Sequence, residues 1–119
     1  MSFDFNSTVP IYVQLVDKIK RDVISGKLKA GERLPSVRLW ALDMQVNPNT
    51  MQKALAELED TGLIFTERTN GKFVTEDSAL IETLRRKYAE TLSAEFLENM
   101  RSLGFNSEEI AQIILRSEK

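Results

Sequence analysis

The chain has 119 residues, of which 16 are basic and 18 acidic, giving a formal net charge of -2. It contains no cysteine and no histidine, which excludes disulfides, thiol nucleophiles, serine–histidine–aspartate triads and zinc sites built from thiolate or imidazole. With 42% apolar and 29% charged residues, it is expected to form one small soluble domain, or one domain with an appendage. Because it has no signal peptide and no run of about 18 apolar residues, we expect a cytoplasmic protein without a membrane partner, metal or cofactor.

The first part of the chain predicts one amphipathic helix and a short second helix. Over residues 11–24 apolar side chains recur at three- and four-residue spacing after Pro10, which suits the start of a helix. Gly26 follows as a helix stop. Ser36 can cap a second helix over residues 37–44.

A third helix is predicted from Pro48 to Asp60, with Asn47 as N-cap, proline at the first helical position and Gly62 as the stop. At about 100° per residue its apolar and polar side chains separate onto opposite faces. The first face is expected to pack inward and the second to face outward. The inward set is Met51, Ala54, Leu55 and Leu58, and the outward set is Asn49, Gln52, Lys53 and Ala56.

Two short strand-like runs, residues 63–67 and 72–75, flank a turn that contains Asn70 and Gly71. An Asn-Gly pair between such runs is a strong hairpin signal. From Ser78 a long helical pattern continues to Leu103, and a last helix follows that Asn106 or Ser107 can cap. We therefore predict a mainly α fold with a small β-hairpin: a winged helix-turn-helix domain in residues 1–76 and a C-terminal two-helix tail in residues 77–119.

A winged helix-turn-helix places the outward face of its third helix in the major groove and its hairpin tip at the backbone or minor groove. On that face, amide side chains suit adenine edges, and Thr50 and Lys53 suit phosphate or guanine. The alternatives are a merely solvated polar face, or a winged helix that binds protein. Residues 1–76 contain ten basic and ten acidic side chains, so this domain has no net charge, which favours binding to protein. The placement of the cations near the expected DNA surface instead favours binding to DNA.

The sequence also resembles the N-terminal domain of GntR-type bacterial transcription regulators over about residues 9 to 75. The motif Asn-Pro-Asn-Thr at residues 47–50 and a tail of only two helices resemble the YtrA subfamily. The resemblance implies dimers that bind operator DNA and usually repress, with control of transporter operons as a frequent role. The segments that carry it are residues 10–15, 24–38, 49–50, 54–55, 58–59, 62–64 and 71–74.

Position by position, the resemblance implies DNA contacts at Arg33, Arg38, Thr50, Gln52 and Gly71. The guanidinium of Arg38 can grip a phosphate or a guanine with two hydrogen bonds, and the alternative is an ion pair with an acid such as Asp43. All candidate DNA-binding residues are Arg33, Ser36, Arg38, Asn47, Asn49, Thr50, Gln52, Lys53, Arg68, Asn70, Gly71 and Lys72.

Three positions depart from many relatives. Pro48 and Gln52 stand where relatives often carry basic residues, which implies a different base preference. Leu39 stands where they commonly carry glutamate, which removes half of a capping box at Ser36. We expect the neighbouring Trp40 to be in the core, and the alternative is a contact with a partner at the surface.

The apolar stripe of the tail is predicted to form a homodimer, because one winged domain reads too few base pairs to select an operator. The alternative is packing within one chain. The sequence does not decide whether a small-molecule effector binds. Enzymatic activity is not expected, because no pair of carboxylates occurs in a recognisable catalytic motif. The candidate dimerisation residues are Leu80, Leu84, Tyr88, Leu92, Phe96, Met100, Leu103, Ile110, Ile113 and Ile114.

Overall fold

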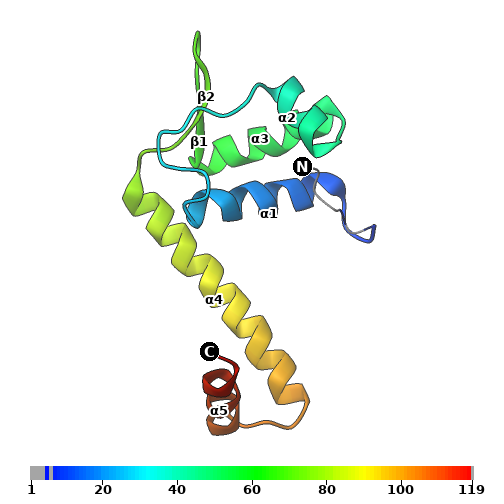
Figure 1. Cartoon of the computed structure of the whole chain (residues 1–119), viewed down its shortest axis with the longest axis vertical. Helices are drawn as coiled ribbons and strands as arrows, with labels where there is room; N and C mark the ends of the chain where they lie inside the picture. Colours follow the sequence, from blue (N-terminus) through cyan, green and yellow to red (C-terminus); the bar gives the residue numbers. More distant parts are fainter. Residues whose placement is uncertain (1–4, 6, 119) are drawn as a thin grey trace. The chain divides into compact units, whose positions relative to one another are not determined.

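The computed structural model describes Phe5 and residues 7–118 and is mainly helical, with one small hairpin (Figure 1). This confirms the predicted fold class. Contacts divide the chain into two units, Met1–Leu84 and Arg85–Lys119, and each is described by itself. The elements are α1 (Ile11–Ile24), α2 (Val37–Met44), α3 (Pro48–Thr61), β1 (Ile64–Glu67), β2 (Gly71–Val74), α4 (Ser78–Ser102) and α5 (Ser107–Ser117).

Side-chain caps set the starts of α2 and α3 as the sequence predicts. The Ser36 hydroxyl accepts a hydrogen bond from the Leu39 N–H at 3.2 Å, and the Asn47 side-chain oxygen accepts one from the Asn49 N–H at 2.7 Å. Such caps satisfy backbone donors that have no partner inside the helix. Pro10, by contrast, is the residue before α1 and not part of its first turn.

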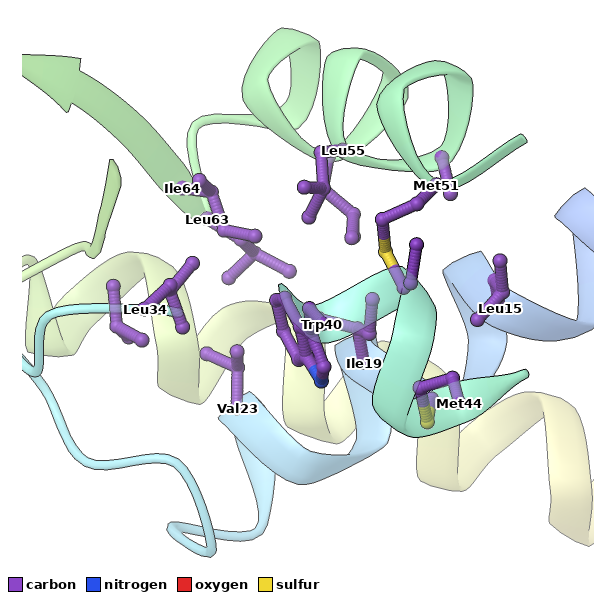
Figure 2. Packing of buried hydrophobic residues seen from close by; sticks show 14 residues of the cluster. Leu15, Ile19, Val23, Leu34, Trp40, Met44, Met51, Leu55, Leu63 and Ile64 are labelled. Atoms are coloured by element: carbon purple, nitrogen blue, oxygen red, sulfur yellow. The ribbon is translucent and has the colours of Figure 1, made fainter. Parts of the chain in front are cut away.

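The core of the first unit is a cluster of apolar side chains from α1, α2, α3 and the hairpin. In Figure 2 the indole of Trp40 lies in the middle of this cluster, and only 9% of the residue is exposed, which confirms the predicted core position. The inward face of α3 is also confirmed as buried. Its four apolar residues, Met51, Ala54, Leu55 and Leu58, have no exposed surface.

The hairpin is antiparallel, with Glu67 opposite Gly71 and Ile64 opposite Val74. A short segment before α2 adds to it, because Arg33 forms a bridge with Phe73. On either side of that bridge, the Leu34 N–H donates to the Lys72 carbonyl oxygen at 2.8 Å and the Val74 N–H donates to the Glu32 carbonyl oxygen at 2.9 Å. The loop that precedes α2 is therefore attached to the wing, an arrangement that the local sequence did not predict.

The long helix α4 begins in the first unit and ends in the second. Its first turns belong with the winged domain, since Ile81 and Leu84 pack against the core cluster. In the second unit, the capping box of α5 is confirmed: the Glu109 N–H donates to the Asn106 side-chain oxygen at 2.9 Å, and the Asn106 N–H donates to the Glu109 carboxylate at 3.0 Å. Within the described residues, every helix is too short or too polar to cross a membrane.

Candidate nucleic-acid interface

The outward face of α3 carries the side chains that the sequence predicts. Asn49, Gln52 and Lys53 are exposed, whereas Thr50 is half-buried. The N-terminal end of the helix bears the partial positive charge of unpaired backbone N–H groups, which favours anions. This end of α3 therefore combines amide hydrogen-bonding groups with a positive potential.

Lys53 is held in place by an aromatic partner. Its ammonium lies 3.9 Å from the centre of the Tyr12 ring, within the range of a cation–π interaction. Tyr12 belongs to α1, and with Asn49 and Thr50 the pair lines a shallow groove between α1 and α3. The sequence indicates Tyr12 only as part of an apolar helical face, and no local signal marks it as a partner of Lys53.

Arg38 is exposed on α2. In the part of the chain that the structure describes, its guanidinium has no ion pair and no hydrogen bond, so the alternative of a pair with Asp43 is not observed. A cation that remains solvated in the free protein can bind a phosphate without first breaking an internal contact.

The Arg33 side chain lies beside Gly71, at the end of the wing next to the hairpin turn. A Cβ atom built on Gly71 would be 3.6 Å from the Arg33 Nε, and the φ angle of Gly71 is +99°, which L side chains rarely adopt. The same two residues line a groove between the wing and the start of α2, together with Arg68 and Ser36. The structure thus brings three predicted cations, Arg33, Arg68 and Lys72, to one surface, where they lie beside one acid, Glu67.

Lys72 has a different environment from the other cations. Its ammonium donates to the Glu59 carboxylate at 2.7 Å and to the Thr66 hydroxyl at 2.9 Å, and Thr66 donates to the second Glu59 oxygen at 2.6 Å. We call this triad the wing clasp, because it joins the last turns of α3 to both strands of the hairpin. Lys72 remains a candidate DNA contact, but its charge is already balanced within the chain.

The ionisation of Glu59 follows from the wing clasp. Burial alone raises the pKa of the Glu59 carboxyl, but hydrogen bonds from Lys72 and Thr66 and the positive charge of Lys72 lower the pKa more, so the net direction is downward. Glu59 therefore stays ionised at neutral pH. The sequence indicates only an acidic residue toward the far end of α3, because its partner lies on another element.

Three further candidates form hydrogen bonds with nearby parts of their own chain. Ser36 and Asn47 are the caps described above, and the Asn70 side chain donates to the Glu67 carboxylate at 3.3 Å across the hairpin turn. Their remaining donors and acceptors face solvent, since all three residues are exposed. Any role in binding would therefore be added to a structural one.

The predicted dimerisation residues divide into three groups by exposure. The buried group is Ile110, which is 1% exposed and lies in the interior of the second unit and not on its surface. Five residues are half-buried, among them Leu80 and Leu84 of the first unit. The other three are Tyr88, Met100 and Ile113. The exposed group is Leu92, Phe96, Leu103 and Ile114.

Comparison with known proteins agrees with this architecture. Residues 11–74 match the family described as bacterial regulatory proteins, gntR family. The chain is 35% identical over 112 residues to the uncharacterised HTH-type transcriptional regulator YhcF of Bacillus subtilis, covering 94% of this chain and 93% of the relative. It is 40% identical over 78 residues to the HTH-type transcriptional repressor YtrA of the same species, covering 66% of this chain and 60% of the relative.

A solved structure also matches nearly the whole chain. A GntR family transcriptional regulator from Listeria monocytogenes superposes with a TM-score of 0.90 at 41% identity, covering 96% of this chain and 100% of that one. The matched region includes α1, α2, α3 and the hairpin, on which the candidate surface lies. This chain therefore belongs to the GntR family of bacterial transcription regulators.

Proposed function

We propose that this chain is a cytoplasmic, sequence-specific DNA-binding regulator that represses transcription by occupying a palindromic operator as a homodimer. The main support for the proposal is a set of exposed arginines: Arg38 on α2, Arg33 in the segment before it and Arg68 in the turn of the wing. Within the described residues, Arg33, Arg38 and Arg68 have no carboxylate partner. Beside them, the exposed amide groups of Asn49 and Gln52 supply the hydrogen bonds that base edges require.

The placement of charge answers the objection that the winged domain has no net charge. Glu67 lines the wing groove, but Arg33, Arg68 and Lys72 line it as well, so the cations outnumber the acid there. Glu59 of α3 is paired with Lys72, so its charge repels phosphates less than a free carboxylate would. Phosphate contacts give affinity, and base contacts give sequence preference. The division of cations and amides between α2, the wing and α3 fits that scheme.

Two further features support the dimer and the repressor role. Phe96 in α4 is 40% exposed, Leu103 in the turn after α4 is 71% exposed, and Ile114 in α5 is 46% exposed. This is a large apolar area for one small unit to leave in water. A twofold dimer would cover this area and present two winged domains to half-sites about 34 Å apart. YtrA, a relative, is named a repressor, and the resemblance to its subfamily makes a transporter operon the regulated locus that we propose.

The competing function is a winged helix that binds protein and not DNA. A gel-shift titration of the full chain on the promoter fragment of its own operon separates the two functions. We expect a shifted band whose affinity falls steeply with salt, because bound phosphates release counterions. No shift on any duplex from the native locus would support the protein-binding alternative.

The variant Arg38→Ala sharpens this experiment. Losing one phosphate or guanine contact should reduce binding by about 1–3 kcal/mol. The matched control is Arg116→Ala, which removes the same charge from the end of α5, outside the candidate surface. Equal effects of the two variants would show that only net charge matters and that Arg38 makes no specific contact.

A further inference from the structure

The outer face of α2 carries two leucines that the fold does not cover. Leu39 and Leu42 are 64% and 75% exposed, the highest values among the large hydrophobic residues that the structure describes in the first unit. They are three positions apart, so they lie on the same face of the helix. Single exposed leucines need no explanation, but an adjacent pair on one helix face is a candidate contact surface.

These leucines line an open groove between α2 and the start of α3, with a volume of about 510 Å³. The other lining residues that the structure describes are Ser36, Arg38, Val46 and Pro48. The lining therefore contains one cation and no acid. A polyanion with apolar edges is compatible with this groove, because Arg38 attracts phosphate and no carboxylate opposes it.

The groove is continuous with the surface to which DNA binding is assigned above. Ser36 and Leu39 also line the groove at the wing, whose charged residues are three cations and one acid: Arg33, Arg68, Lys72 and Glu67. At the other side, Pro48 is the first residue of α3 and adjoins Asn49. Leu39 and Leu42 thus lie between the phosphate-binding candidates and the base-reading helix.

We propose that Leu39 and Leu42 determine part of the sequence specificity by contacting the C5-methyl groups of thymines in the major groove. This proposal rests on the proposed DNA-binding function and adds a reader that makes no hydrogen bond. Thymine is the only base that presents a methyl group in the major groove, and apolar side chains recognise it by contact. The leucines neither repel phosphate nor leave a hydrogen-bonding group unpaired when water is displaced.

The test uses the full chain and the operator duplex from its own promoter, with thymines replaced by deoxyuridines one at a time. Uracil keeps the pairing of thymine and lacks only the methyl group. For the wild-type chain we expect at least one thymine in each half-site where this change weakens binding about fourfold, the value for removing one buried methyl-sized group from an apolar contact. The paired variants Leu39→Gln and Leu42→Gln should lose this sensitivity while still binding the duplex.

The control is Val13→Gln, which replaces an exposed apolar residue of α1 and should leave the uracil sensitivity unchanged. Far-UV circular dichroism establishes that each variant is folded. Uracil substitution without effect on the wild type, or the same sensitivity in the leucine variants, overturns the proposal even though DNA binding stands. A glutamine variant that binds DNA normally but no longer forms the wild-type oligomer would assign these leucines to a protein contact. Failure of the wild type to bind any operator duplex would instead refute the proposed function.

Discussion

The wing clasp makes a specific prediction about the charge of Glu59. The variant Glu59→Gln keeps the shape of the side chain but removes the negative charge opposite Lys72. It also replaces one of the two accepting oxygens by an amide NH2 group. The side chains of Lys72 and Glu59 are 15% and 29% exposed, so the pair is neither fully buried nor fully solvated. Losing the charge leaves an ammonium that is mostly shielded from water without a counter-ion.

The expected loss of unfolding free energy in Glu59→Gln lies between two limits. A hydrogen bond to a charged group contributes about 1.5–3 kcal/mol, and an exposed ion pair contributes about 0–1 kcal/mol. For this intermediate burial we expect Glu59→Gln to lower the free energy of unfolding by about 1–2 kcal/mol. Urea denaturation measures this change, with the fluorescence of Trp40, the only tryptophan, as the probe.

The pH dependence gives an independent check of the same contact. Because the pKa of Glu59 in the folded chain is below its ordinary value of 4.5, the folded state binds this proton less readily than the unfolded state. The stabilisation is therefore fully present above the unfolded-state pKa and is lost as the pH falls through the folded-state pKa. The difference in stability between the wild type and Glu59→Gln should shrink over that acidic range.

A matched control separates the clasp from general charge effects. Glu57 is exposed on the same helix and has no ion pair within the described residues, so Glu57→Gln makes the same change of charge without breaking a contact. We expect it to change stability by less than about 0.5 kcal/mol. Equal losses in the two variants, or a Glu59→Gln deficit that persists unchanged into acid, would refute the reasoning.

Three further variants test the core, a helix cap and the assembly. Trp40→Ala should cost about 3–5 kcal/mol because it empties the centre of the core, as measured by urea denaturation followed by circular dichroism, whereas a cost below about 1 kcal/mol would contradict the burial of this ring. Asn106→Ala should lower the stability of α5 by about 1 kcal/mol through loss of the capping box; a thermal melt identical to that of the wild type would show that the cap contributes nothing. The double variant Leu92→Glu with Phe96→Glu should sediment as a monomer and lose operator binding while the winged domain stays folded, and a persisting dimer would place the interface elsewhere.

The sequence alone determined most of the secondary structure, because those signals act over a few neighbouring residues. Ser36, Asn47 and Asn106 each offer a side-chain oxygen to a backbone N–H two or three positions ahead, so their caps could be predicted before any packing was known. The Asn70-Gly71 pair between two apolar runs likewise predicted the hairpin. The polar outer face of α3, and with it the first candidates for base contacts, followed from helical periodicity.

Only the tertiary structure decided which of these side chains are available to a partner. Lys53 lies over Tyr12 of α1 and Lys72 pairs with Glu59 of α3, and neither pairing can be predicted from sequence spacing because the partners come from different elements. Periodicity also assigns Ile110 and Ile114 alike to the apolar stripe of the tail, yet one is 1% and the other 46% exposed. The physical reason is that a helical period identifies an apolar side chain, whereas the neighbouring elements packed around it decide whether that side chain is covered.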